Sequence, residues 1–159
     1  MTYQFLLDLE GARASEELVT NYLSTLTDEY KFENVGNVRE YFYKGDIKAT
    51  NLATGEVHML EIKDDSRIAT THNILCEERS YFFNSKSWRK GNFYSDYEYY
   101  CIYSRSESKL YIFDFSILKK IYKKGRIKSI THHDNINEVY LLPLETAKEA
   151  GALIAELDI

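Results

Sequence analysis

The spacing of apolar residues predicts an amphipathic helix near the start of the chain. Over residues 12–27, apolar side chains recur at helical spacing and polar side chains occupy the opposite side. The apolar side contains Leu18, Val19, Tyr22, Leu23 and Leu26. Ser15 and the acids after it, Glu16 and Glu17, would lie near the first turn, where the helix dipole favours negative charge. We therefore expect a helix over this range with one buried face.

The pattern then changes to the two-residue period of β-strands. Residues 46–50 and 59–63 each alternate polar with apolar side chains. The segment NLATGE between them has the small, glycine-containing composition of a tight connection. We interpret the whole segment as a β-hairpin. Further strands are predicted before it, over residues 31–38, and after it, over residues 73–78.

Downstream, the pattern predicts a loop and a second hairpin. Residues 84–95 are polar and contain glycine, which suits a long, mobile loop or lid near a site. Residues 97–104 and 110–116 are rich in aromatic and β-branched side chains and are separated by the polar segment RSESK. We expect these two runs to pair as antiparallel strands.

The last part of the chain should return to helix and strand. Residues 116–124 show helical spacing of their apolar side chains, and residues 138–142 are typical of a final strand. Pro143 separates this strand from a predicted closing helix over residues 144–157. Because no internal repeat or linker interrupts the chain, we expect one α/β domain over residues 1–159, with strands and helices sharing one core.

Length and composition fit this organisation. A chain of 159 residues is short for two separate cores. Cys76 and Cys101 lie in apolar stretches without the spacing of a zinc or disulfide framework, so we expect two buried thiols. No apolar run approaches the ~20 residues that cross a bilayer, and the N-terminus lacks a basic leader. We expect a cytoplasmic protein that does not contact a membrane.

The candidate catalytic residues lie in the first predicted hairpin. Asp46 opens its first strand, and Glu61 and Lys63 project from one face of its second strand. If the turn lies near Thr54 and Gly55, antiparallel pairing brings Asp46 within about a residue or two of Glu61. Two carboxylates and a lysine would then share one face. Such a set suits metal-dependent phosphodiester hydrolysis, in which a metal is held near the phosphate, a water is activated and developing charge is neutralised.

This arrangement resembles the PD-(D/E)xK nuclease superfamily, whose pattern is an acid at the start of one strand and acid-x-lysine on the next. Here Asp46 is followed by a gap of 14 residues and then by Glu61, Ile62 and Lys63. The chain departs from the pattern in having Gly45, not proline, before the first acid. In overall order it is similar to the archaeal Holliday junction resolvases and related small phage nucleases. The resemblance implies a restriction-endonuclease-like mixed β-sheet flanked by helices.

The resemblance also implies roles for individual residues. The family commonly carries a glutamate on its first helix, and Glu16 fits that place because it aligns with the apolar side of the predicted helix. Asp46 and Glu61 would bind Mg²⁺, with Mn²⁺ as a substitute and the carbonyl of Ile62 as a further ligand. Lys63 would orient or help to deprotonate the attacking water. The implied function is a metal-dependent DNA endonuclease.

Charge alone does not predict nucleic-acid binding. The net charge is −5, whereas phosphate binding is carried mostly by lysine and arginine. One stretch without acids is nevertheless basic and contains Lys119, Lys120, Lys123, Lys124, Arg126 and Lys128. It is either a nucleic-acid-binding face or a solvated helix face. The expected loop carries a second set, Lys86, Trp88, Arg89 and Lys90. Such a set suits stacking on a base or holding a phosphate, and a tryptophan that pins the loop explains it equally well.

The same residues allow other interpretations. Asp46, Glu61 and Lys63 could be the solvated side of a half-exposed hairpin. The chain could also be a nuclease-fold module without turnover, from a phage or mobile element, that binds nucleic acid or a protein. Its acidic composition supports this alternative, because a negative surface can meet a basic partner. The resemblance favours DNA as the partner and leaves a symmetric homodimer open.

Overall fold

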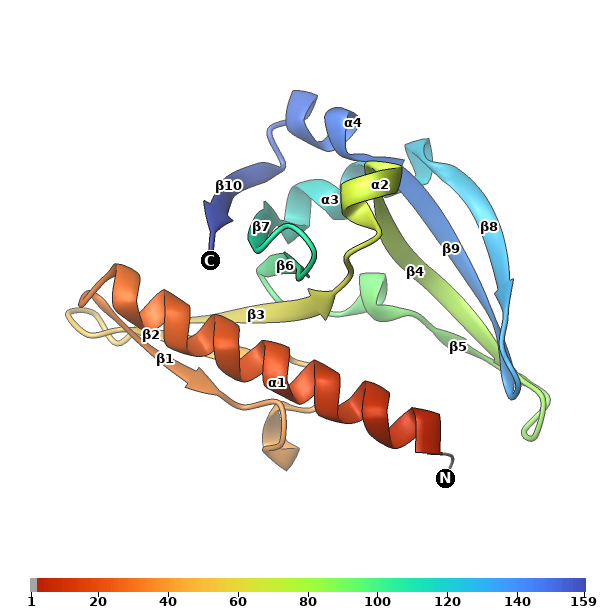
Figure 1. Ribbon diagram of the computed structural model, residues 1–159, viewed down its shortest axis with the longest axis horizontal. Coiled ribbons are helices and arrows are strands. Elements are labelled where there is room, and N and C mark those ends of the chain that lie inside the picture. The colour runs from red at the N-terminus through yellow and green to blue at the C-terminus, as the bar shows by residue number, and fades with distance from the viewer. Residues whose placement is uncertain (1–2) are drawn as a thin grey trace.

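The computed structural model describes residues 3–159, with side chains from Glu10 onward, and has a mixed α/β fold (Figure 1). Its helices are α1 (Tyr3–Leu26), α2 (Ile68–Thr71), α3 (Phe115–Ile121) and α4 (Leu144–Glu149), with 3₁₀ turns η1 (Arg39–Tyr41), η2 (Asn92–Tyr94) and η3 (Tyr122–Lys124). Its strands are β1 (Tyr30–Asn34), β2 (Ile47–Asn51), β3 (Val57–Asp64), β4 (Asn73–Phe82), β5 (Ser87–Lys90), β6 (Tyr99–Ser104), β7 (Lys109–Asp114), β8 (Arg126–Thr131), β9 (Asn135–Pro143) and β10 (Leu153–Asp158).

The larger sheet is mixed and has six strands in the order β1-β2-β3-β6-β7-β10. Its neighbours are antiparallel except β3 and β6, which run parallel with Ile62 opposite Cys101. Helix α1 lies across the β1–β3 part of this sheet and contacts β1 and β3 (Figure 1). The hairpin expected over residues 46–63 is confirmed as β2 and β3, and the strand expected before it is confirmed as β1.

The smaller sheet is antiparallel and has the order β5-β4-β9-β8. It stands beside the larger sheet, at the right in Figure 1. Strands β4 and β5 belong to the connection between β3 and β6, whereas β8 and β9 follow β7. The strand expected over residues 73–78 is confirmed as β4, which continues to Phe82 with an irregularity between Glu77 and Arg79. The chain thus leaves the larger sheet for the smaller one twice and returns to the larger sheet each time.

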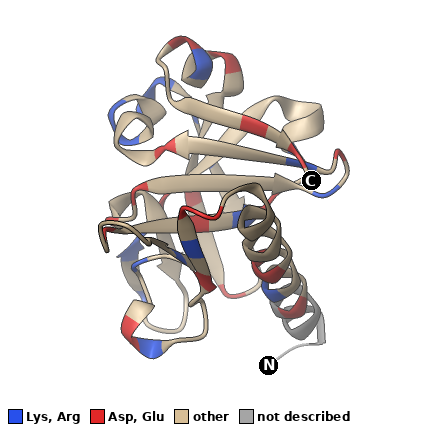
Figure 2. Cartoon of the chain, turned by 90° about the vertical axis from the view of Figure 1, so that its left-hand side faces the viewer, with Lys and Arg blue, Asp and Glu red and all other residues tan. Residues whose placement is uncertain are grey.

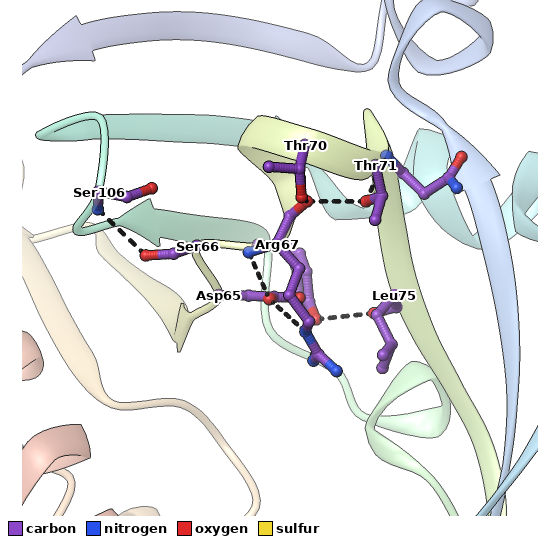
Figure 3. Close-up of polar contacts among 9 residues, drawn as sticks. Asp65, Ser66, Arg67, Thr70, Thr71, Leu75 and Ser106 are labelled. Atoms are coloured by element: carbon purple, nitrogen blue, oxygen red, sulfur yellow. Dashed lines mark hydrogen bonds and ion pairs between the residues drawn. The ribbon is translucent and has the colours of Figure 1, made fainter.

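A short, hydrogen-bonded segment leads from β3 to the smaller sheet (Figure 3). Asp65 accepts hydrogen bonds at Oδ1 from the backbone nitrogen (3.1 Å) and the Nε (2.8 Å) of Arg67. The hydroxyl of Ser66 accepts one from the backbone nitrogen of Ser106 (3.1 Å). Thr71 donates its hydroxyl to the Arg67 carbonyl (2.8 Å). These bonds fix the turn that includes α2 and set the direction in which the chain leaves the larger sheet to form β4.

Two hydrophobic clusters hold these layers together. One joins α1 to the larger sheet and includes Val19, Leu23, Ile47, Leu60 and Cys101. The other is rich in aromatic rings and includes Cys76, Phe93, Tyr97, Tyr100, Phe113, Phe115 and Tyr122. In the second cluster, the ring centroids of Phe93 and Phe115 lie 5.0 Å apart in an edge-to-face arrangement. Both cysteines are free and buried, as expected.

Helix α1 differs from the predicted helix in its start and its buried face. It begins well before residue 12, so Glu16 lies in its middle and not at its positive end. Val19 and Leu23 are buried as predicted, whereas Leu18 and Leu26 are 42% and 50% exposed. Only a narrow stripe is covered, because the helix meets β1 and β3 along one side and solvent on the others. Among the described residues, no helix is both long and apolar enough to cross a membrane.

The prediction of a long loop over residues 84–95 is wrong. Within this range, β5 pairs antiparallel with β4, with Tyr81 opposite Trp88, and η2 follows it. β5 is a short edge strand on which Trp88, Arg89 and Lys90 are all exposed. A strand of this kind lacks the alternation of buried and exposed residues that sequence patterns rely on.

The predicted closing helix over residues 144–157 is also wrong. Helix α4 ends at Glu149, and β10 then pairs with β7 as the final strand. Gly151 adopts φ +76° in the turn between them, a conformation that favours glycine. The predicted second hairpin (β6, β7) and the helix after it (α3) are confirmed, although β8 was not predicted. β8 carries part of the basic stretch, including Arg126 and Lys128, so that stretch is not one helix face.

We predict that Leu23→Ala lowers the free energy of unfolding by about 2–5 kcal/mol, because Leu23 is only 5% exposed. Leu26→Ala removes the same atoms from the same helix at a half-exposed position and should cost less than about 1 kcal/mol. Urea denaturation of both variants measures the difference. Equal losses would contradict the orientation of α1 described above.

Candidate active site

The β2–β3 register brings Asp46 next to Glu61. Ile47 pairs with Leu60, and the backbone nitrogen of Asp46 donates to the Leu60 carbonyl (2.8 Å). The backbone nitrogen of Ile62 donates to Asp46 Oδ2 (2.9 Å). Because Ile47 pairs with Leu60, Asp46 and Glu61 lie beside each other on the two strands, and each affects the pKa of the other. The convergence expected from the sequence is therefore present in the structure.

Lys63 completes this arrangement on the same face of β3. Its Nζ lies 3.1 Å from Glu61 Oε1, and the exposed fractions of the two side chains are 34% and 16%. Burial acts to lower the pKa of Lys63, but the negative charges of Glu61 and Glu77 outweigh it and raise the pKa above its ordinary value. Lys63 is therefore a cation that stays charged through the neutral range.

The backbone conformation at residue 45 excludes the proline that the family pattern has before the first acid. The φ of Gly45 is +139°, whereas the proline ring holds φ near −65°. A Cβ at Gly45 would also lie only 3.0 Å from the Leu60 carbonyl oxygen. The backbone that presents Asp46 to Glu61 thus depends on glycine at this position.

Glu16 reaches the same site from α1. It lies beside Gly36, where an added Cβ would come within 2.5 Å of Glu16 Oε2. Burial raises the pKa of Glu16, and the nearby charge of Glu61 raises it further. Glu16 in turn raises the pKa of Asp46. The structure therefore brings together all four side chains expected to be catalytic, Glu16, Asp46, Glu61 and Lys63.

The paired carboxyl groups hold protons more tightly than isolated acids do. Burial, followed by the charge of Asp46, raises the pKa of Glu61 from 4.5 to about 7, although Lys63 acts in the opposite direction. Burial raises the pKa of Asp46 as well, and the hydrogen bond from Ile62 only partly offsets it. Perturbed carboxyl groups of this kind are typical of functional sites, because their charges are confined where solvent cannot screen them.

Two pockets open onto this pair, and Asp46 and Glu61 line both. The helix-side pocket has a volume of about 560 Å³ and is lined by Gly11, Ala12, Glu16, Asp46, Glu61, Ile62, Lys63 and Asp64. The sheet-side pocket has a volume of about 480 Å³ and is formed by the segment between β1 and β2, strands β4 and β5, and the segment from η2 to Tyr97. The carboxyl groups are thus reached from two directions.

The donor set fits Mg²⁺, the cation that the family resemblance implies. Within the described residues, no group of three or more His, Cys, Asp or Glu side chains is arranged to enclose a metal. Mg²⁺ does not need such a cage, because it keeps several waters and binds through one or two carboxylates. Asp46 and Glu61 supply two hard oxygen groups whose mutual repulsion a divalent cation would relieve. The contact that Ile62 makes in the structure is the hydrogen bond from its backbone nitrogen to the Asp46 carboxylate. Ile62 also lines the helix-side pocket.

A polar network not predicted from the sequence joins α1 to the end of β3. Ser15 is almost fully buried and donates its hydroxyl to Asp64 Oδ2 (2.6 Å). Arg105 Nη2 donates to the same oxygen (2.8 Å) and to the Ser15 hydroxyl (3.1 Å). The network holds α1 beside β3, so it positions Glu16 relative to Lys63. Its members are far apart in sequence, and no local pattern connects them.

The two predicted nucleic-acid-binding sets lie in different places. Arg89 and Lys90 line the sheet-side pocket together with Asp46 and Glu61. Trp88, 45% exposed, packs against the ring of Tyr81 and the guanidinium of Arg79, and Lys86 lies in the β4–β5 turn. Lys119, Lys120, Lys123 and Lys124 belong to α3 and η3 and line neither pocket. Lys119 donates to the Ser95 carbonyl (2.8 Å) and Lys123 lies 3.6 Å from Glu78.

Comparison with known proteins does not assign the chain to a family. No family model, curated protein or solved structure matches it. A fold alone does not determine a function, so the arrangement of side chains in the site is what bears on activity.

We predict that the metal-free protein loses stability as pH rises from about 4.5 to about 7, because native Glu61 binds its proton more tightly than unfolded Glu61 does. One pKa unit corresponds to about 1.4 kcal/mol, so the charged form above pH 7 costs on the order of 3 kcal/mol. Glu61→Gln removes this cost and should be more stable than the wild type above that pH.

Urea denaturation in a chelator across this pH range measures the effect. Glu33→Gln is the matched control, because Glu33 is a strand glutamate paired with a lysine at 3.2 Å but its side chain is more exposed, at 39%. Parallel stability curves for the wild type and Glu61→Gln would show that Glu61 titrates normally.

Proposed function

We propose that the protein is a metal-dependent nuclease of the PD-(D/E)xK type that cuts DNA. The observation that carries this proposal is the meeting of the Asp46 and Glu61 carboxyl groups, with Lys63 3.1 Å from Glu61, at the wall of two open pockets. The order of elements supports a restriction-endonuclease-like fold: a first helix carries Glu16, and a hairpin on a mixed sheet carries the remaining groups.

The interpretation of these groups as a solvated hairpin face is less consistent with their surroundings. Glu61 is only 16% exposed, and its pKa is raised mainly by burial. A carboxylate whose only role is to keep a surface hydrated would lie in solvent. Placing it beside two other acids in a poorly solvated position costs stability. A buried carboxyl group with a raised pKa is typical of sites where its charge takes part in binding or catalysis.

Asp46 and Glu61 would hold the Mg²⁺. When bound, this ion would polarise the phosphate and lower the pKa of a coordinated water. Glu16 faces the same carboxyl groups from α1 and would act as a further acceptor for water in the helix-side pocket.

Lys63 is assigned to charge stabilisation and not to proton abstraction. Its pKa is raised, so its amine already carries the proton that a general base would have to accept. A fixed ammonium group beside the carboxyl pair would instead offset the negative charge that develops on the phosphate. It would also orient the attacking water by donating a hydrogen bond.

The distribution of charge favours binding of DNA phosphates at one site over attraction by the whole surface. Figure 2 shows acidic and basic residues interspersed along the chain, with both signs along α1. Arg89 and Lys90 are cations that line the sheet-side pocket together with the carboxyl groups. We infer that phosphates are engaged at this pocket and that the remainder of the surface contributes little.

We predict that Mg²⁺- or Mn²⁺-dependent cleavage of plasmid or branched DNA falls by at least about a hundredfold in Asp46→Asn and in Lys63→Met, because each removes a charge that acts on the reacting phosphate. Lys31→Met is the matched control, since Lys31 forms the same kind of pair with Glu33 on β1 away from both pockets. Gel assays under single-turnover conditions measure the rates. Activity that survives both site variants would rule the proposal out.

A second prediction concerns metal binding in the absence of DNA. At a Mg²⁺ concentration about a hundredfold above Kd, the wild type should be stabilised by ~2.7 kcal/mol, because the ion binds only the folded state. Asp46→Asn should lose this stabilisation while the Lys31→Met control keeps it. Thermal unfolding with and without Mg²⁺ or Mn²⁺ measures it. DNA or protein binding without metal-dependent stabilisation would instead favour a non-catalytic binding module.

A further inference from the structure

The sheet-side pocket contains groups that cation binding does not require. Asp46 and Glu61 line it, and its wall also includes Phe82, Arg89 and Asn92. Its volume of about 480 Å³ lies within the range of ~300–1,000 Å³ for pockets that take small organic groups. The pocket is therefore large enough for a ligand moiety beside the carboxyl groups.

The amide of Asn92 indicates what that moiety must offer. Its Oδ1 and Nδ2 are both buried, and neither has a hydrogen-bond partner within the part of the chain that the structure describes. Such a group destabilises the free protein, because its hydration is lost and nothing replaces it. A ligand that presents a donor beside an acceptor, reached by a small rotation of the side chain, would satisfy both atoms.

The backbone that carries Asn92 is firmly held. The Gly91 nitrogen donates to the Glu78 carbonyl (2.8 Å), and a Cβ on Gly91 would collide with the Glu77 carbonyl. Tyr97 donates its hydroxyl to the carbonyl of Asn92 (2.9 Å). The backbone from which the amide projects is thus fixed, so only the side-chain torsions of Asn92 have to adjust to a ligand.

Flat groups on the same wall complete a surface for stacking. The guanidinium carbon of Arg89 lies 4.5 Å from the centroid of the Phe82 ring. Arginine planes and aromatic rings are the surfaces on which unpaired bases stack. An asparagine amide matches the adjacent donor and acceptor on the edge of a base. Next to this wall, Asp46 and Glu61 stand where the proposed nuclease would hold the phosphate.

We propose that the sheet-side pocket receives one unpaired nucleobase adjacent to the scissile phosphate, so that the preferred substrate is nucleic acid with an unpaired nucleotide at the cut. This inference rests on the proposed nuclease function. A base within an intact duplex cannot enter, because its partner covers its edge and its neighbours cover its faces. It would first have to leave the stack, which costs least where it is already unpaired.

The test compares two DNA probes bound to the full chain in a chelator, so that binding is measured without metal-dependent cleavage. One probe is a duplex with a single bulged 2-aminopurine, and the other is the fully paired duplex of otherwise identical sequence. The bulged probe should bind about tenfold more tightly, since stacking of one base gives a gain of this order. Its 2-aminopurine fluorescence should change on binding.

Asn92→Ala and Phe82→Leu should each reduce the preference for the bulged probe to about twofold or less. Ser104→Ala is the matched control, because the Ser104 hydroxyl is also buried without a partner but does not line the pocket. It should keep the full preference. Asn92→Ala should not lower the unfolding midpoint, because it breaks no hydrogen bond of the side chain; a purely structural residue would lower it.

The outcomes separate this inference from the nuclease function. Equal binding of both probes by the wild type, with Mg²⁺-dependent cleavage that requires Asp46, would overturn the base pocket and leave the nuclease standing. A preference that requires Asn92, without cleavage under any divalent metal, would support the base pocket and overturn the nuclease. Loss of the preference in Ser104→Ala would show a global effect and would overturn the pocket.

Discussion

A slip of one residue between β2 and β3 would turn Glu61 and Lys63 to the face of the sheet opposite Asp46, because successive side chains on a strand point to opposite faces. The Asp46 backbone nitrogen opposes such a slip by its bond to the Leu60 carbonyl. The Asp46 carboxylate opposes it again by accepting from the nitrogen of Ile62. The side chain proposed to hold a cation therefore also fixes the strand that carries its partners, and Gly45 makes the required backbone accessible.

The site concentrates negative charge where it is poorly solvated, and the surrounding structure compensates only in part. Lys63 neutralises one charge, whereas Glu16, Asp46 and Glu61 remain close together with raised pKa values. In the two hydrophobic clusters, the apolar pattern of the sequence agrees with the structure, because apolar side chains fill both clusters and the cysteines are buried among them. Local departures from this consistency are expected where function requires them. The carboxyl pair is the clearest such departure in this molecule.

Sequence patterns predicted the parts of the site that are local. Two residues on one strand share a face, and a tight turn sets their partner, so the grouping of Asp46, Glu61 and Lys63 followed from residues 46–63 alone. The place of Glu16 followed from its alignment with Val19 and Leu23, although the start of the helix was wrong.

Contacts between distant segments could not be predicted in this way. Ser15, Asp64 and Arg105 meet only because α1, β3 and the end of β6 are packed together, and no spacing links them. The edge strand β5 was mistaken for a loop because its exposed residues have no period. Without β5, the sequence also cannot predict the pocket that Arg89 and Asp46 both line.

The connection between β3 and β6 explains how the smaller sheet comes to face the carboxyl groups. Parallel neighbours require a long crossover, since the chain must return to the same end of the sheet. Here the crossover contains β4, β5 and η2, and it carries Arg89 and Asn92 to the wall of the pocket that Asp46 and Glu61 also line. The hairpin supplies the reactive groups, and the crossover supplies the surface that a substrate must fit. Changes in β5 or η2 can therefore alter which nucleic acid is accepted while the carboxyl pair and its register stay intact.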